Sequence, residues 1–220
     1  MDSDTPDLKG FQELCHEYNA ILMVDVAHDL GCSGPGGSGE IGRQDMLGKI
    51  DLVMGSFSKT FASNGGFVSS NNEGVKQYLR YYSAPNTFSN ALSPPAVAVV
   101  EKALEIIRSD EGEQLRNKLF TAINVFRTAL TENNLSVLGV PSPIVPVLVG
   151  KSEIGRVASK FLADEGVLSN LVEFPAVALY ASRFRMQVMS EHTVQQCQEA
   201  AIIIGRAIKM AQQAVDVNSV

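Results

Sequence analysis

The sequence has 220 residues, 45% of them hydrophobic and 19% charged, with a formal net charge of -6 at pH 7. This length suffices for one large or two modest globular domains. The acidic balance and the lack of basic runs argue against nucleic acid as the main partner. Because no apolar run approaches the roughly 20 residues that span a bilayer, we expect no transmembrane segment and a cytoplasmic location. The three cysteines, at positions 15, 32 and 197, lack zinc-site spacing, so we expect reduced thiols and no metal.

The first third of the chain predicts an α/β fold. Apolar residues at helical spacing predict a helix that ends at Asn19, and the continuous apolar run 21–24 then predicts a strand covered on both faces of a parallel sheet. This strand carries Asp25 at its carboxyl end, followed by Ala27 and His28. Open α/β sheets bind ligands outside such strand ends.

A glycine-rich loop follows over residues 31–42. It contains a G-x-G-x-x-G match at Gly34, Gly36 and Gly39. The match is a weak dinucleotide fingerprint, because no apolar-periodic helix follows it and Asp51 lies too close to bind a ribose. We interpret the segment as an active-site loop.

The stretch 51–70 is the most informative part of the sequence. It predicts a buried strand over 52–54, a polar turn with Lys59, and a second strand over 67–69 that begins after Gly65 and Gly66. Near a low-dielectric interior, desolvation favours the neutral amine, which can attack a carbonyl. Lys59 is therefore a candidate Schiff-base lysine, although on this stretch alone an ordinary surface lysine is the favoured explanation.

The remaining pattern predicts mainly helices, then a smaller unit. We expect a short helix over 75–82, a loop over 83–95, and two connecting helices that continue to Asn134. Strands over 144–149, 167–172 and 183–189 and helices over 154–165 and 194–215 are expected to follow.

Five polar residues are predicted to lie at strand ends or in adjacent turns, and together they suit the cofactor pyridoxal 5'-phosphate: Asp25, His28, Ser56, Lys59 and Arg185. Lys59 would hold the cofactor as an imine, and Asp25 would keep its pyridine nitrogen protonated. His28 would donate to the phenolic oxygen, Ser56 would bind the phosphate, and the small Ala27 would leave room for the ring. Each residue alone also has an ordinary structural explanation.

The order of these motifs resembles the α-oxoamine synthases, a branch of the fold-type-I pyridoxal-phosphate enzymes within the aminotransferase class I/II superfamily. The resemblance covers nearly the whole chain and rests on residues 24–28, the glycine-rich loop, residues 55–59, 65–66, 88–94 and 183–193. It implies the C-terminal part of the type I transferase fold, with a partial, mostly parallel sheet of the large domain and a small α+β domain. We expect half of the large domain over 1–93, connecting helices over 94–139 and the small domain over 140–220.

The resemblance also implies an activity and its partners. Such enzymes condense an amino acid with an acyl thioester, with decarboxylation, to give an α-amino ketone. The family pattern implies that Ser89 contacts the phosphate across a homodimer interface and that Arg185 binds the substrate carboxylate. We expect Arg183 to point the opposite way from Arg185. Val26 and Asp29 depart from the family pattern, which commonly has an acidic and a small residue there.

Segments 141–146, 170–177 and 183–189 further resemble the oxoamine-synthase domain of saxitoxin-type polyketide-synthase-like enzymes. That likeness implies an acyl-carrier protein as donor instead of coenzyme A. Only 24 residues precede Asp25, whereas about half of the large domain precedes this point in the family. We therefore expect a C-terminal portion that is inactive when isolated.

Three alternatives remain. Ser56 to Lys59 is also an S-x-x-K match of the penicillin-binding type, which would require a helix at the serine and further motifs that are missing. A plain aminotransferase shares the lysine and the aspartate. An inactive fragment that acts only within a larger enzyme is the third reading.

Overall fold

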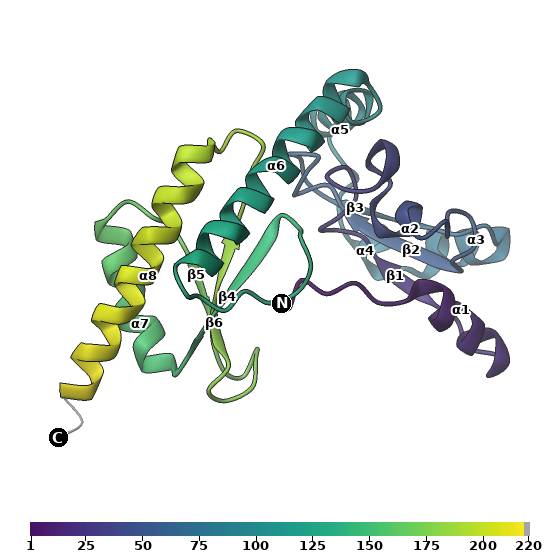
Figure 1. Cartoon of the computed structure of the whole chain (residues 1–220). Helices are drawn as coiled ribbons and strands as arrows, with labels where there is room; N and C mark the ends of the chain where they lie inside the picture. The colour runs from purple at the N-terminus through teal and green to yellow at the C-terminus, as the bar shows by residue number, and fades with distance from the viewer. Residues whose placement is uncertain (218–220) are drawn as a thin grey trace. The chain divides into compact units, whose positions relative to one another are not determined.

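The computed structural model describes residues 1–217, with side chains up to residue 215. It divides into two compact units (Figure 1). The first unit comprises Pro6–Arg116, and the second comprises Met1–Thr5 together with the chain from Asn117 onward. This division falls inside helix α6, whereas the sequence analysis placed boundaries at 93/94 and 139/140; that three-part division stays a prediction.

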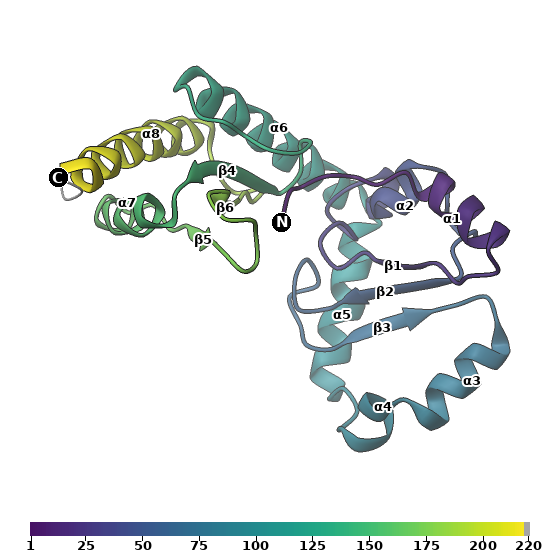
Figure 2. The ribbon, with the colours of Figure 1, turned by 90° about the horizontal axis from the view of Figure 1, so that it is seen from below.

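A three-stranded sheet organises the first unit. Its strands lie in the order β1-β2-β3, with β1 parallel to β2 and β2 antiparallel to β3 (Figure 2). The elements of this unit are α1 (Leu8–Glu17), β1 (Met23–Asp25), the 3-10 helix η1 (Pro35–Gly37), α2 (Gly39–Arg43), β2 (Leu52–Ser56), β3 (Gly66–Ser69), α3 (Glu73–Tyr82), α4 (Ala84–Phe88) and α5 (Pro94–Ile107).

Polar side chains cap the helices of this unit. The backbone N–H of Gly10 donates to the Asp7 carboxylate at 3.0 Å and fixes the start of α1. At α5, Ser93 is the N-cap and Pro94 the first helical residue, where a missing N–H costs nothing. The expected loop over 83–95 is wrong in one respect, because α4 forms within it.

The core of the first unit lies between the strands and the segments around α1 and α2. Its buried apolar side chains are Leu8, Val26, Ile41, Met46 and Ile50. The expectation that the first strand is covered on both faces is wrong for this chain, since Met23 is 56% exposed. One face of β1 therefore carries the core contacts, and the other lies open.

Asp51 joins α1 to the sheet. Its carboxylate accepts from the Leu22 N–H at 2.9 Å and from the buried Gln12 amide at 3.0 Å. These hydrogen bonds lower the pKa of the Asp51 carboxyl. The contact fixes the distance between the helix and the beginnings of β1 and β2.

The second unit is an antiparallel sheet with helices. Its strands lie in the order β4-β6-β5. Its elements are α6 (Asp110–Glu132), β4 (Ile144–Gly150), α7 (Ser152–Asp164), β5 (Asn170–Val172), β6 (Ser182–Gln187) and α8 (Val194–Val217). Helix α7 packs against α8 and against the sheet, and Leu162, Phe184 and Ile204 are fully buried. Among the residues described, no helix is long and apolar enough to cross a membrane.

Candidate active site

The carboxyl ends of β1 and β2 bring the predicted site residues of the first unit to one edge of the sheet. In the parallel ladder, Asp25 is the register partner of Met54, and the Val26 N–H continues the pairing to the Met54 carbonyl at 2.8 Å. Ser56, two residues beyond Met54, ends β2. Because neighbouring parallel strands end at the same edge, Asp25 and Ser56 lie at the same edge of the sheet.

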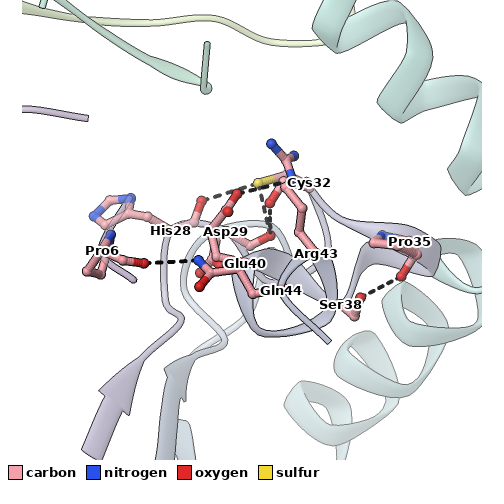
Figure 3. A network of polar contacts seen from close by, with 10 residues as sticks. Pro6, His28, Asp29, Cys32, Pro35, Ser38, Glu40, Arg43 and Gln44 are labelled. Atoms are coloured by element: carbon pink, nitrogen blue, oxygen red, sulfur yellow. Dashed lines mark hydrogen bonds and ion pairs between the residues drawn. The ribbon is translucent and has the colours of Figure 1, made fainter. Parts of the chain in front are cut away.

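The chain turns sharply after Asp25. The Asp25 carboxylate accepts from the Ala27 N–H at 2.8 Å, which fixes one of its oxygens against the backbone. Ala27 is 8% exposed, so the chain between the two polar residues packs into the unit. The His28 side chain is exposed, while its carbonyl oxygen accepts from the Cys32 thiol at 3.2 Å (Figure 3).

Lys59 lies in the tight loop that joins β2 to β3. The Phe57 N–H donates to Gly65 at 2.9 Å, the Ser63 N–H donates to Phe57 at 2.8 Å, and the Ala62 N–H donates back to Lys59 at 2.9 Å. These three bonds hold the loop in one shape. The lysine itself is exposed, so the expected burial near a low-dielectric interior is wrong for this chain.

Aromatic side chains pack within and beside the loop that carries Lys59. The Phe57 ring contacts Phe61, which is 4% exposed, at a centroid distance of 5.4 Å and Phe67 at 5.6 Å. The Ser56 hydroxyl lies 2.7 Å from the Ser58 hydroxyl and accepts from the Ser58 N–H at 3.1 Å. Contacts between residues close in sequence therefore hold the end of β2 and the loop that carries Lys59 together.

This geometry removes the serine-hydrolase alternative. The S-x-x-K motif of penicillin-binding enzymes places its serine at the start of a helix, with the lysine one turn later. Here Ser56 ends a strand and Lys59 lies in a hairpin loop. The two side chains therefore do not share a helical face.

The glycine-rich loop contains a residue whose contacts the sequence analysis did not find. The Asp29 carboxylate accepts from the backbone N–H of Glu40 at 2.6 Å, across eleven positions. Burial raises the pKa of the Asp29 carboxyl, while the hydrogen bond from Glu40 acts in the opposite direction. The departure of Asp29 from the family pattern was the one signal that pointed to it. A helix, α2, begins at Gly39, but its five residues are too few for the apolar-periodic helix of a dinucleotide fingerprint.

Ser89 follows α4, and its hydroxyl donates to the Pro85 carbonyl at 2.5 Å. The residue is exposed. Nearby, Leu92 packs against the backbone of Gly65, where an added Cβ would lie 2.5 Å from a leucine methyl. The segment after Ser89 therefore contacts the loop that carries Lys59.

Arg185 belongs to the second unit. It lies on the central strand β6, where its register partners are Pro146 and Asn170, and it is half-buried. The expectation that Arg183 points the opposite way is wrong, because residues two apart on a regular strand share a face. Arg183 is 6% exposed and binds the Asp2 carboxylate and the Ala181 carbonyl, so its guanidinium is committed within the unit.

Among the described residues, no group of three or more His, Cys, Asp or Glu side chains is arranged to hold a metal ion. Burial raises the pKa of the Cys32 thiol to about 11, with a further contribution from the charge of Asp29. Cys32 is thus a neutral, poorly reactive thiol that serves as a hydrogen-bond donor in the loop.

The first unit thus carries Asp25 at the end of β1 and Lys59 in the loop after β2. The family model for aminotransferase class I and II matches residues 1–204, and the chain belongs to this family. Serine palmitoyltransferase from Sphingobacterium spiritivorum is 37% identical over 96% of the chain. The 8-amino-7-oxononanoate synthase from Trichlorobacter lovleyi is 34% identical over 94% of the chain. Each match covers 52% of the relative.

The solved structures agree with the sequence relatives. A serine palmitoyltransferase structure, described as holding a pyridoxal-phosphate internal aldimine, superposes with a TM-score of 0.89 at 27% identity. The match covers 96% of this chain and 53% of that one. The predicted type I transferase fold and the resemblance to α-oxoamine synthases are therefore confirmed. The chain spans about half the length of the curated relatives it matches.

Proposed function

We propose that the protein carrying this chain is a pyridoxal-phosphate-dependent acyltransferase of the α-oxoamine-synthase type. It condenses an amino acid with an acyl thioester and releases carbon dioxide and a free thiol, leaving an α-amino ketone. The observation that carries this proposal is the placement of Asp25 and Lys59 after neighbouring parallel strands, in a chain that aligns over 96% of its length with a serine palmitoyltransferase.

The chemistry of the donor set fits the cofactor. One edge of the first unit's sheet offers a carboxylate, an imidazole, a hydroxyl and an amine, from Asp25, His28, Ser56 and Lys59. Ala27, the residue before His28, is small and buried, which suits a flat ring packed beside it. Pyridoxal 5'-phosphate bound there supplies an electron sink for negative charge at the substrate α-carbon.

Each residue has a distinct task in this proposal. Asp25 holds a proton on the ring nitrogen, and its fixed oxygen keeps the carboxylate in one orientation. His28 donates to the phenolic oxygen, and Ser56 donates to the phosphate. Lys59 attaches the cofactor through its amine and exchanges a proton with the substrate.

Two further residues complete the proposed site in the whole protein. Ser89 contacts the phosphate from a second copy of the chain in a homodimer. Arg185 binds the substrate carboxylate, a task for which a guanidinium offers two parallel N–H donors.

The finer features remain part of the proposal. They are the cytoplasmic location, the choice between coenzyme A and an acyl-carrier protein as thioester carrier, and the inactivity of the chain on its own. The division into half of a large domain, connecting helices and a small domain also belongs here. The acyl-carrier donor is supported only by the likeness to saxitoxin-type enzymes.

The attachment residue is tested by borohydride reduction in the presence of pyridoxal phosphate, followed by peptide mapping. We expect the reduced cofactor on the peptide that contains Lys59, and no specific label after Lys59→Ala. Lys76→Ala is the matched control, because Lys76 is an exposed lysine of the same unit that pairs with Glu73. Label that persists after Lys59→Ala, or that is lost in the control, contradicts the assignment.

The plain aminotransferase is the second candidate, because the matching family model is named for that activity. The two activities differ in their products. A synthase releases carbon dioxide and one free thiol for each amino acid consumed, whereas an aminotransferase converts an amino acid and a keto acid without releasing either. Thiol titration with an acyl thioester as second substrate therefore separates them, and amino-group exchange without thiol release favours the aminotransferase.

A further inference from the structure

Backbone hydrogen bonds and one side-chain carboxylate close the glycine-rich loop. The Gly31 N–H donates to the Gly37 carbonyl at 2.7 Å and the Gly39 N–H to the Ser33 carbonyl at 2.8 Å. The carboxylate is that of Asp29. Asp29 directly follows His28, and its Oδ2 atom accepts from the Glu40 N–H at 2.6 Å. The contact joins the segment that enters the loop, at Asp29, to the segment that leaves it, at Gly39 and Glu40. A Cβ built on Gly39 would lie 2.5 Å from the same Oδ2 atom, so the returning backbone passes directly over the carboxylate. Glycine at position 39 and aspartate at position 29 therefore form a matched pair.

The main chain of Asp29 fixes the segment that enters the loop as well. Its carbonyl oxygen accepts from the Ser33 hydroxyl at 3.2 Å, the Ser33 N–H at 3.0 Å and the Cys32 N–H at 3.2 Å. The Cys32 thiol lies between this carbonyl, at 3.4 Å, and that of His28, at 3.2 Å. Figure 3 shows this network, with the His28 ring on the side of the backbone away from Cys32. The network thus fixes the backbone from which that ring projects.

The closed loop rests on the turn that carries the lysine. A Cβ on Gly31 would lie 2.7 Å from a Thr60 methyl, so the loop backbone and the residue after Lys59 are in direct contact. One short chain of contacts therefore runs from Asp29 through Cys32 and its neighbour Gly31 to Thr60, the residue after Lys59.

We propose that Asp29 is a positioning residue, whose carboxylate closes the glycine-rich loop and thereby holds His28 and the Lys59 turn in the relative places that pyridoxal phosphate needs. This inference rests on the proposed function. The position of the acceptor oxygen on the side chain determines the contact with the Glu40 N–H, and the charge of the side chain is secondary. An asparagine keeps an oxygen acceptor at the same place, whereas alanine removes it and glutamate carries it one methylene too far.

The test uses three variants and one control in the protein that carries this chain. The variants are Asp29→Asn, Asp29→Ala and Asp29→Glu. The control is Glu40→Ala, which removes the ion pair with Arg43 in the same loop but keeps the Glu40 N–H that Asp29 binds. For each protein we would measure the midpoint of thermal unfolding, the affinity for pyridoxal 5'-phosphate, the visible circular dichroism of the bound cofactor, and borohydride labelling of Lys59.

We expect Asp29→Ala and Asp29→Glu to weaken cofactor affinity by about tenfold, the equivalent of one lost hydrogen bond to a charged group. The visible circular dichroism should change sign or collapse in both, because the ring no longer meets His28 and Lys59 in a fixed geometry. Asp29→Asn and Glu40→Ala should stay within about threefold of the parent affinity and keep its dichroism. A purely structural role would move the unfolding midpoint without changing the dichroism of the cofactor.

The outcomes separate this inference from the proposed function. Parent protein that fails to label Lys59 overturns the proposed function. Parent protein that labels Lys59, with parent-like dichroism and affinity in Asp29→Ala, overturns the positioning role alone. Should Asp29→Ala fail to fold, the comparison of Asp29→Asn with Asp29→Glu decides, and equal behaviour of these two variants contradicts the inference.

Discussion

Gly39→Ala is the most informative single substitution in the first unit, because two independent costs meet at this position. Gly39 has a φ of +68°, a conformation in which an L-residue costs about 1–2 kcal/mol. The new methyl would also lie 2.5 Å from Asp29 Oδ2 and 3.0 Å from its Cγ, so the carboxylate must leave the Glu40 N–H. A hydrogen bond to a charged group contributes about 1.5–3 kcal/mol.

The lower end of that range applies here. Burial already raises the pKa of Asp29, so a carboxylate pushed toward water regains part of its hydration. Adding about 1.5 kcal/mol for the hydrogen bond to the conformational cost gives a loss of about 3 kcal/mol in the free energy of unfolding. Urea unfolding monitored by far-ultraviolet circular dichroism measures this loss.

Gly36→Ala is the matched control. Gly36 has a φ of +58°, and nothing lies within 4 Å of a Cβ built there. It should therefore cost only the conformational term of about 1–2 kcal/mol. In an Asp29→Ala background, where no carboxylate blocks the new methyl, Gly39→Ala should fall to the same cost. Equal losses for the two glycine substitutions in the parent chain would refute the reasoning, because the clash with Asp29 would then contribute nothing.

Three further outcomes test the site. Asp25→Asn should lower kcat more than it lowers cofactor retention, because an amide does not hold a proton on the ring nitrogen; unchanged turnover at full cofactor content contradicts this role. Arg185→Lys should raise the amino-acid KM without loss of bound cofactor. Arg183→Lys should mainly lower the unfolding midpoint, since Arg183 binds Asp2 and Ala181. A raised KM in Arg183→Lys and a lowered midpoint in Arg185→Lys would exchange the two assignments. The Cys32 thiol has a pKa of about 11, against 9.0 for a free thiol, so at pH 8 it should react with iodoacetamide about a hundredfold more slowly in the folded than in the unfolded chain. The reaction rate in the folded chain should keep rising with pH up to about 11. Equal rates in folded and unfolded chain, measured by mass spectrometry, contradict the burial of the thiol.

Local patterns predicted the strand ends correctly. The apolar run before Asp25 and the apolar residues 52–54 before Ser56 are short-range signals, and the structure has strands at both places. Their parallel pairing agrees with the predicted α/β sheet. The placement of Asp25, Ser56 and Lys59 at one sheet edge was therefore accessible from the sequence, while the role of each residue stays a prediction.

Exposure was harder to predict, since it depends on what covers a strand and not on the strand itself. The apolar run that contains Met23 indicates burial on both faces, yet Met23 is 56% exposed in this chain. Lys59 was expected near the interior for the same reason, and it is exposed. Neither error affects the order or the direction of the strands.

The contact between Asp29 and Glu40 could not have been predicted from periodicity. It joins a side chain to a backbone N–H across eleven positions, and neither helical nor strand spacing places these groups together. Five positive-φ glycines, at positions 31, 34, 36, 37 and 39, allow the chain to fold back there. The glycine content indicated a loop, but only the structure shows which groups close it.

The local construction of the hairpin that carries Lys59 has a consequence for how the site folds. The turn from Ser56 to Gly66 closes over ten positions, and the pairing of Met23 with Leu52 closes over only 29. The entropic cost of closing a loop is low for such short separations, and chains with short-range contacts fold fast. We infer that this part of the sheet forms as one cooperative unit, so the amide hydrogens of Val26, Phe57 and Ser63 should exchange with solvent together.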